Sequence, residues 1–306
     1  MNSRDWKKIR HRIEFLFVHV VLLLIWSASL SVALKGAEFL GWLLFSIFRV
    51  RRRVALDNLR HAFPEKSTGE RLSIAKRSYQ NFAKMIVDYM RFPVMDRETV
   101  LSLCKLEKGG KEKLEWLINN GKGAVMVAGH FGSWELMGAA LAQMGYSISF
   151  LVGEQHNKFV DHMMNDNRRL MGIQIIHMGM AVRGVIRTLR NNGFVALLAD
   201  QDAHKEGVFI DFFGKKSSTH QGPAIFALKI GVPIFFGSAI RLPRGKMRIE
   251  FELLRFDHLK DITPENVKEV TQAHAAVLEK MIRKYPDHWF WMHRRWKTKP
   301  PENNTS

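Results

Sequence analysis

Short apolar runs alternate with helical patterns between Gly121 and Leu253, and this alternation constrains the fold more than any other feature of the chain. The first run, Ala124 to Ala128, is followed by a helical pattern from Trp134 to Met144. Continuous apolar runs of this length are typical of strands buried on both faces, with helices as the connections between them. Further apolar runs occupy residues 147–152, 173–176, 195–199, 233–239 and 247–253. The sequence therefore predicts an α/β fold, with a mixed and mostly buried sheet flanked by helices.

A long apolar segment near the N-terminus predicts contact with a membrane. It extends from Phe15 to Leu34, with His19 as its only strongly polar side chain, and resumes from Phe39 to Phe48. About 20 apolar residues are enough to cross a bilayer. Basic residues flank both ends, so the positive-inside rule gives no orientation. A single crossing and an interfacial or hairpin anchor with both ends in the cytoplasm both remain open, and we favour the second.

The composition gives further limits. A formal net charge of +18 would attract nucleic acid, an anionic membrane surface or an acidic protein, and its concentration around the apolar segment favours the membrane. The single cysteine, Cys104, excludes an internal disulfide framework and fits a reducing compartment. It lies in a polar, helix-like stretch from Val100 to Lys105, and we expect a structural or surface role for it.

These patterns divide the chain into four parts. Apolar residues recur at helical spacing from Val54 to Leu117, and a last helix is expected to begin at Pro264 and to end near Lys284. We therefore expect an N-terminal membrane anchor at 1–50, a helical region at 51–120, an α/β domain at 121–299 and a disordered tail at 300–306.

A histidine follows the first predicted strand directly. His130 and Glu135 have the spacing His-x-x-x-x-acid, for which 13 His and 29 acidic residues in 306 positions predict about one chance occurrence. The chain has three, the other two being His156 with Asp161 and His274 with Glu279. Only His130 lies between a buried strand and the start of a helix, where the reversal of the chain brings the histidine and the acid together.

This position suits acid–base chemistry. A side chain at the carboxyl edge of a sheet lies where α/β folds bind their ligands. A neutral imidazole takes a proton from an alcohol, and a carboxylate on its other nitrogen fixes the tautomer. Backbone N–H groups at the start of the helix would receive the oxyanion of a tetrahedral intermediate. A histidine that caps a helix beside a surface Glu135 is the simpler alternative.

The blocks around this motif resemble a known family. The stretch from Gly129 to Glu135 resembles the first block of the glycerolipid-type acyltransferase superfamily, and the chain is similar to the lipid A biosynthesis acyltransferases. The resemblance extends over nearly everything after the anchor. It includes Arg53 to Leu59, Phe63-Pro64, Arg168 with Gly172, Ala199-Asp200-Gln201, Phe213-Gly214, Gly222-Pro223-Ala224 and Trp289 to Lys297.

The resemblance implies a lysophospholipid acyltransferase-like fold and roles for particular residues. His130 would be the general base oriented by Glu135, and Arg168 would meet an anionic group of the donor or the acceptor. Asp200 would line the site, and the other expected substrate-binding residues are Gln201, Phe213, Gly214, Pro223 and Ala224. A solvated surface position for Arg168 and a strand-end turn role for Asp200 remain open.

The resemblance also implies the substrates and the location. The donor would be the thioester of an acyl carrier protein, and the acceptor would be a hydroxyl of a lipid A precursor at the cytoplasmic side of a bacterial inner membrane, among anionic lipids. No cofactor, metal or nucleic acid is expected, although Asp200, Asp202 and His204 have a spacing seen in metal sites. Trp289, Trp291 and Trp296 alternate with basic residues, which favours an interfacial belt over a nucleic-acid patch.

Two alternatives remain. The chain lacks the Glu-Gly-Thr-Arg type of block that is usual in enzymes that acylate glycerol phosphate, so a saccharolipid is the favoured acceptor. Enzymes that acylate other glycolipids, such as mannosylated phosphatidylinositol, share many of the same blocks. A membrane-tethered polyanion-binding protein without chemistry would explain the charge and the anchor, but it leaves the setting of His130 unexplained.

Overall fold

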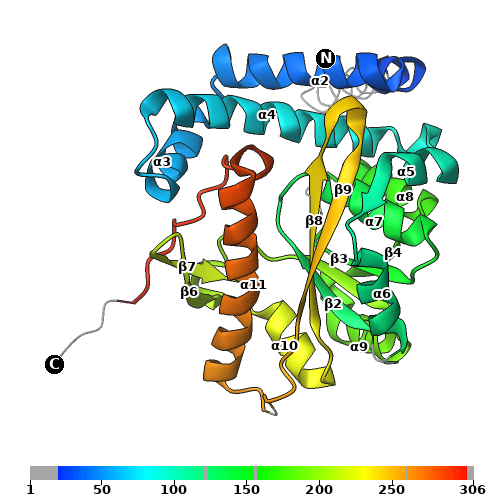
Figure 1. The fold of residues 1–306 in the computed structure, drawn as a ribbon, viewed down its shortest axis with the longest axis vertical. Helices are drawn as coiled ribbons and strands as arrows, with labels where there is room; N and C mark the ends of the chain where they lie inside the picture. The colour runs from blue at the N-terminus through cyan, green and yellow to red at the C-terminus, as the bar shows by residue number, and fades with distance from the viewer. Residues whose placement is uncertain (1–19, 120, 122, 155–156, 260, 302–306) are drawn as a thin grey trace, which may run out of the picture.

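A seven-stranded sheet forms the centre of the molecule (Figure 1). The computed structural model describes residues 20–119, 121, 123–154, 157–259 and 261–301. Strand order is β1-β9-β8-β2-β5-β3-β4, with β8 and β9 antiparallel and every other neighbouring pair parallel. The strands are β1 Cys104–Leu106, β2 Ala124–Ala128, β3 Ile148–Val152, β4 Gln174–His177, β5 Phe194–Leu198, β8 Ile234–Arg241 and β9 Met247–Leu254. The predicted mixed α/β sheet is therefore confirmed.

Helices cover both faces of the sheet. Buried side chains of α7 (Trp134–Gln143) and α6 (Gly110–Asn119) form one hydrophobic core, together with α5 (Arg97–Leu103) and a partly buried residue of α8 (Lys158–Leu170). The second core includes α9 (Ala181–Arg190), α10 (Gly222–Ile230) and α11 (Pro264–Lys284). α3 (Arg52–Ala62) and α4 (Thr68–Met90) contribute buried side chains to the second core, which they share with α10 and α11.

Two short elements differ from the sequence prediction. Cys104 begins β1 and is buried, whereas a helix-like stretch was expected there. Burial raises the pKa of its thiol to about 12, so the thiol stays protonated. A hairpin of β6 (Val208–Phe212) and β7 (Lys215–Thr219) was not predicted. Each strand has only five residues, and those of β7 are polar. The sequence of β7 therefore shows no alternation of apolar and polar residues that would predict a strand.

The N-terminal apolar segment is divided into two helices. Residues 20–27 are helical, and a new helix, α2 (Leu30–Ser46), begins after Ser29, whose hydroxyl accepts a hydrogen bond from the Val32 N–H. Among the described residues, no helix combines the length and the apolar character that crossing a membrane requires. Residues 15–19 of the predicted segment and residues 302–306 of the predicted tail lie outside the described residues.

α2 lies along α4 through a close backbone contact (Figure 1). A side-chain carbon at Gly41 would lie 2.6 Å from the Cα of Gln80, so only glycine fits at this point. An ion pair of 2.8 Å between Lys84 and Glu38 joins the same two helices. The outer side of α2 is open at Gly36, where an added carbon would meet no atom within 4 Å.

The two glycines give a matched test of this packing. Gly41→Ala should push α2 away from α4, and we expect it to lower the free energy of unfolding by about 1–3 kcal/mol. Gly36→Ala should raise it by about 0.4–1 kcal/mol, because alanine restricts the unfolded chain and favours the helix. Thermal unfolding of both variants in one detergent measures the difference. Equal effects of the two substitutions would show that α2 does not pack on α4 as described.

Candidate active site

The loop after β2 places His130 at the carboxyl edge of the sheet. Gly132 has φ +61°, and a side-chain carbon there would lie 1.7 Å from the Ala239 carbonyl oxygen, so the loop requires glycine. α7 begins at Trp134, and the ring of this residue lies 5.0 Å from the His130 ring, centroid to centroid. The tight turn leaves 22% of the His130 side chain exposed, which keeps the imidazole accessible.

Asp200 reaches the same point from β5. β2 and β5 are parallel and pair in register from Ala124 with Phe194 to Ala128 with Leu198, so their ends coincide. One Asp200 oxygen lies 2.7 Å from His130 Nδ1, and the other accepts the His130 backbone N–H at 2.8 Å. His130 Nε2 is left for a substrate, with the amide nitrogen of Gln201 at 3.4 Å.

The charges of this pair support each other. Burial alone would lower the pKa of His130, but the Asp200 carboxylate, with a further contribution from Glu135, outweighs burial and raises it above its ordinary value. Burial would raise the pKa of Asp200, but the charge of His130 and hydrogen bonds from His130 and Trp289 lower it to about 2. Asp200 is therefore ionised near neutral pH, and the imidazole carries its proton on Nδ1, facing that charge.

The C-terminal segment completes the environment of Asp200. Trp289 donates its indole N–H to Asp200 at 2.8 Å and is 2% exposed. The segment also pairs with the histidine loop, since the Phe290 N–H donates to the His130 carbonyl at 3.0 Å and the Gly132 N–H donates to the His288 carbonyl at 2.8 Å. These backbone hydrogen bonds attach the segment to the histidine loop, and Trp289 can therefore hold the Asp200 carboxylate in place although it lies 89 residues further along the chain.

The proposed aromatic belt in this segment is therefore wrong. Trp289, Trp291 and Arg295 are each 2% exposed or less, and Trp296 is partly buried. The Arg295 guanidinium donates to the Ser218 carbonyl and lies over the Phe212 ring. The aromatic side chains and Arg295 pack against the β6–β7 hairpin and the core, and only Arg294 and Lys297 of the predicted belt are exposed.

Glu135 has a different partner from the one predicted. Its carboxylate binds the Arg168 guanidinium through two contacts, of 2.6 Å and 3.0 Å, and both side chains are largely buried. The expected contact between Glu135 and His130 is wrong, because Asp200 occupies the Nδ1 side of the ring. Glu135 acts on His130 only through its charge. The alternative of a solvated surface position for Arg168 is therefore wrong, because its side chain is largely buried against Glu135.

An apolar hollow lies beside this ion pair. Its volume is about 470 Å³, including space open to solvent, and Trp134, Glu135 and Arg168 contribute to its wall. The rest of the wall is apolar and comes from β2, β3, β5 and α7, with Met137, Phe150 and Leu198 as examples. An apolar lining of this kind suits a hydrocarbon group.

The other predicted substrate-binding residues lie elsewhere. None of Phe213, Gly214, Pro223 and Ala224 is in the wall of this hollow, as far as the described residues define it. Phe213 packs against the rings of Phe63, Trp291 and Trp296, and Ala224 is fully buried in the core. Their role in substrate binding stays a prediction.

The remaining histidine pairs are separate from the site or outside the described part. Burial lowers the pKa of His274 to about 3, so this side chain is neutral and enclosed. Glu279 accepts the Phe213 backbone N–H at 2.6 Å and pairs with Arg283. His156 lies outside the described residues.

The metal-like spacing around Asp202 has another explanation. The Thr298 hydroxyl donates a hydrogen bond to Asp202 at 2.8 Å, and within the described ranges no three His, Cys, Asp or Glu side chains are grouped as metal ligands.

A buried ion pair behind the loop was missed by the sequence analysis. Asp88 of α4 pairs with Arg241 at the end of β8, and the Ser133 hydroxyl donates to Asp88 at 3.0 Å. Ser133 precedes α7 but its side chain does not cap that helix. Three segments distant in sequence meet here, so no local pattern would have shown the contact.

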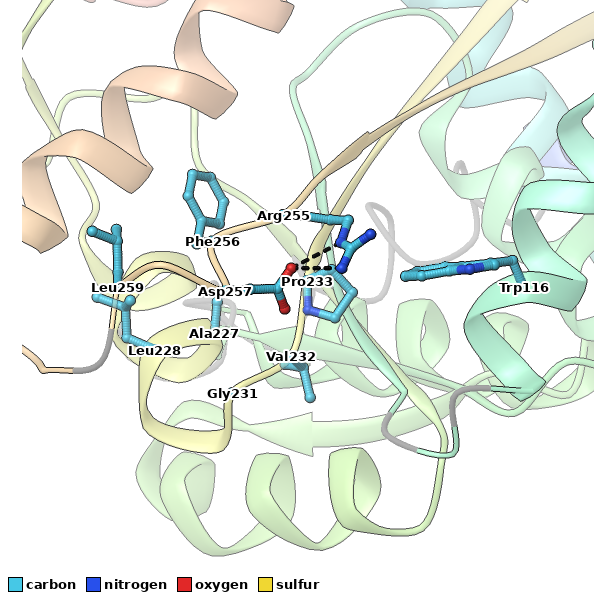
Figure 2. Close-up of a pocket in the computed structure, with 10 residues that line it drawn as sticks. All are labelled: Trp116, Ala227, Leu228, Gly231, Val232, Pro233, Arg255, Phe256, Asp257 and Leu259. Atoms are coloured by element: carbon cyan, nitrogen blue, oxygen red, sulfur yellow. Dashed lines mark hydrogen bonds and ion pairs between the residues drawn. The ribbon is translucent and has the colours of Figure 1, made fainter.

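A larger hollow lies at the opposite edge of the sheet (Figure 2). Its volume is about 730 Å³, including open solvent, and Pro233 directly before β8 contributes to its wall. Figure 2 shows Arg255 between Asp257 and Trp116, and the guanidinium lies 2.8 Å from the carboxylate and 5.3 Å from the ring centroid. The part of the wall that the structure describes contains no histidine, cysteine or hydroxyl side chain, so size alone does not identify the reactive site.

Comparisons with known proteins show which proteins this chain is similar to. The family model described as bacterial lipid A biosynthesis acyltransferase matches residues 3–298. The chain is 24% identical over 223 residues to a phosphatidylinositol mannoside acyltransferase of Mycobacterium tuberculosis, which covers 72% of this chain and 69% of the relative. It is 23% identical over 259 residues to a lipid A biosynthesis palmitoleoyltransferase of Escherichia coli, and this alignment covers 82% of this chain and 80% of the relative. It is 27% identical over 176 residues to a lipid A biosynthesis acyltransferase 2 of Shigella flexneri, and this alignment covers 56% of this chain and 54% of the relative.

The pairing of His130 with Asp200 predicts a change that NMR can measure. In the unmodified protein the pKa of His130 should lie above 6.5, and in Asp200→Asn it should fall below 6.5, because burial is then opposed by the more distant Glu135 alone. Glu135→Gln should lower it less. ¹⁵N-histidine spectra recorded across pH give the three values. A larger shift in the Glu135 variant would reassign the partner of His130.

Proposed function

The chain belongs to the bacterial lipid A biosynthesis acyltransferase family, and from this premise we propose that it moves a fatty acyl group from an acyl carrier protein thioester to a hydroxyl of a lipid A precursor. It is an acyltransferase. The observation that carries the proposal is the His130–Asp200 pair beside an apolar hollow. A general base and a place for a hydrocarbon chain are the two things that this reaction needs from the protein.

The proposed reaction uses His130 Nε2 as the base. The acceptor hydroxyl gives its proton to Nε2 while its oxygen attacks the thioester carbonyl carbon. The imidazolium that forms is stabilised by the Asp200 carboxylate, which is ionised near neutral pH. The tetrahedral intermediate then breaks its carbon–sulfur bond, and the thiolate takes the proton back from Nε2. The first N–H groups of α7 have no intrahelical acceptors and would bind the oxyanion.

Two further roles follow from the hollow. We assign it to the acyl chain, because its wall is mostly apolar and includes Trp134, which packs against His130. Glu135 and Arg168 then hold the wall together through their largely buried ion pair. Gln201 would contact the reacting oxygen from the other side of the imidazole.

A second acceptor has specific support. The relatives include both phosphatidylinositol mannoside acyltransferases and lipid A biosynthesis enzymes, at 23% to 27% identity. Mannosylated phosphatidylinositol is therefore the alternative acceptor. The proposed location is the cytoplasmic side of a bacterial inner membrane, supported by the family and by the apolar side chains that α2 leaves exposed, among them Val32, Phe39 and Leu40.

The acceptor and the base are tested together. Purified protein with an acyl carrier protein donor should acylate a lipid A precursor faster than mannosylated phosphatidylinositol, and His130→Ala and Asp200→Ala should each reduce kcat by at least about 10² while the protein stays folded. Mass spectrometry of the products gives both results. A preference for the inositol lipid would change the acceptor, and near-normal turnover by folded His130→Ala would remove the mechanism.

The donor is tested by ionic strength. Carrier proteins are small and strongly acidic, and the chain carries a net charge of +18, so encounter should be steered by charge. kcat/KM for the carrier-protein donor should fall steeply with salt as the Debye length shortens from about 10 Å at 0.1 M to about 3 Å at 1 M. Acyl-coenzyme A should be the poorer donor with the shallower slope. Equal efficiencies and equal slopes would rule out a carrier protein as the specific donor.

A further inference from the structure

The turn between α2 and α3 exposes an unusual set of side chains. Ile47, Phe48 and Val50 are 57%, 65% and 45% exposed, although each is large and apolar. They lie within four residues of one another, in the turn that joins α2 to α3 (Figure 1). Burial of such side chains is favourable, so a cluster of this kind is typical of a surface that contacts something else.

Arginines alternate with these apolar residues. Arg49 and Arg51 are exposed and, among the described residues, have no ion pair, while Arg53 has only a 4.0 Å contact with Asp57. Arg52 lies over the Phe45 ring, 4.6 Å from its centroid. Four cations gathered in five residues repel each other, and the Asp57 contact and the Phe45 ring offset this repulsion only in part. An anionic surface would remove the repulsion.

The backbone holds this arrangement in place. Arg49 and Arg51 both have φ +51°, a conformation that side chains other than glycine rarely adopt. The Val50 N–H donates to the Leu44 carbonyl at 3.0 Å, and the Tyr79 hydroxyl of α4 donates to the Val50 carbonyl. The backbone of the turn is therefore fixed to α2 and α4, with its three apolar side chains exposed.

We propose that residues 47–53 form a membrane-docking turn that binds the surface of an anionic bilayer. Ile47, Phe48 and Val50 enter the headgroup layer, and Arg49, Arg51 and Arg53 pair with lipid phosphates. Alternating apolar and basic side chains fit the boundary between headgroups and acyl chains, where each finds a suitable partner. The inference deepens the proposed membrane location, and it is tested without substrate, so its failure and the failure of the proposed reaction are distinguishable.

The turn is also connected to the candidate active site. α3 begins directly after it, and the Asn58 amide of that helix donates to the carbonyls of Trp291 and His293 at 2.8 Å and 2.6 Å. These residues belong to the segment that carries Trp289 to Asp200. Docking of the turn would therefore hold the site at a fixed height and tilt above the bilayer, where a lipid acceptor can reach His130.

The test uses one label on the full-length chain. Cys104 is the only cysteine and is buried, so Phe48→Cys can be labelled selectively with a polarity-sensitive fluorophore. With vesicles of phosphatidylglycerol and phosphatidylethanolamine the emission should shift to the blue. The same label at Ile262→Cys, an exposed residue just before α11 at the far end of the molecule, should not respond (Figure 1). A label that reports on its own surroundings separates insertion of the turn from binding by other parts of the chain.

A matched charge control completes the design. Replacing Arg49, Arg51 and Arg53 by alanine should raise the lipid concentration for half the response by at least about tenfold. Replacing Arg183, Arg187 and Arg190 of α9 removes the same charge from another exposed surface and should change it much less. No shift at position 48, an equal shift at 262, or equal effects of the two triple variants would each overturn the proposal. An equal response to pure phosphatidylcholine vesicles would overturn the assignment of the arginines.

Discussion

The buried negative charge of Asp200 determines how the site is assembled. A carboxylate enclosed by protein is stable only when its oxygens are hydrogen-bonded and a positive partner is close. Asp200 has the His130 backbone N–H, the His130 ring and the Trp289 indole N–H. These donors come from the loop after β2 and from the C-terminal segment. One ionised side chain therefore fixes the relative positions of three parts of the chain, and the imidazole is held as a consequence.

Two more ion pairs hold the helix that follows the histidine. Glu135, in the first turn of α7, binds Arg168 of α8, and Ser133 is tied to the Asp88–Arg241 pair between α4 and β8. Loss of one partner of a buried pair leaves an uncompensated charge and costs about 3–5 kcal/mol. The start of α7 is thus restrained from both sides, which suits the proposed role of its first N–H groups in binding an oxyanion.

Sequence patterns were sufficient for six of the seven strands of the sheet, all except β1, and for the position of the histidine. The apolar run 124–128 matches β2 residue for residue, and Trp134 was predicted as the start of the helix that the structure places there. These features are local, since burial of a strand and the start of a helix each leave a signal within a few residues. The resemblance also gathered His130, Asp200 and Arg168 into one site, which their separation of up to 70 residues would otherwise hide.

Pairing within the site could not be predicted in the same way. Spacing suggested Glu135 as the partner of His130, but the register of β2 and β5 brings Asp200 to the ring first. Register depends on how two strands pair, and it cannot be read from the sequence of either strand alone. The burial of Trp289 and Arg295 was missed for a similar reason, because a basic and aromatic stretch has the same composition whether it faces a bilayer or a hairpin of its own chain.

The C-terminal segment also sets the order in which the site can form during synthesis. Chains fold from the N-terminal end as they emerge, so β2, β5 and the loop with His130 are complete well before Trp289 is made. Asp200 then lacks one of its donors, and the loop lacks its pairing with residues 288–290. A chain still attached to the ribosome, or one that has lost its last residues to a protease, therefore holds an incomplete site. Only a full-length chain would carry the finished arrangement to its substrate.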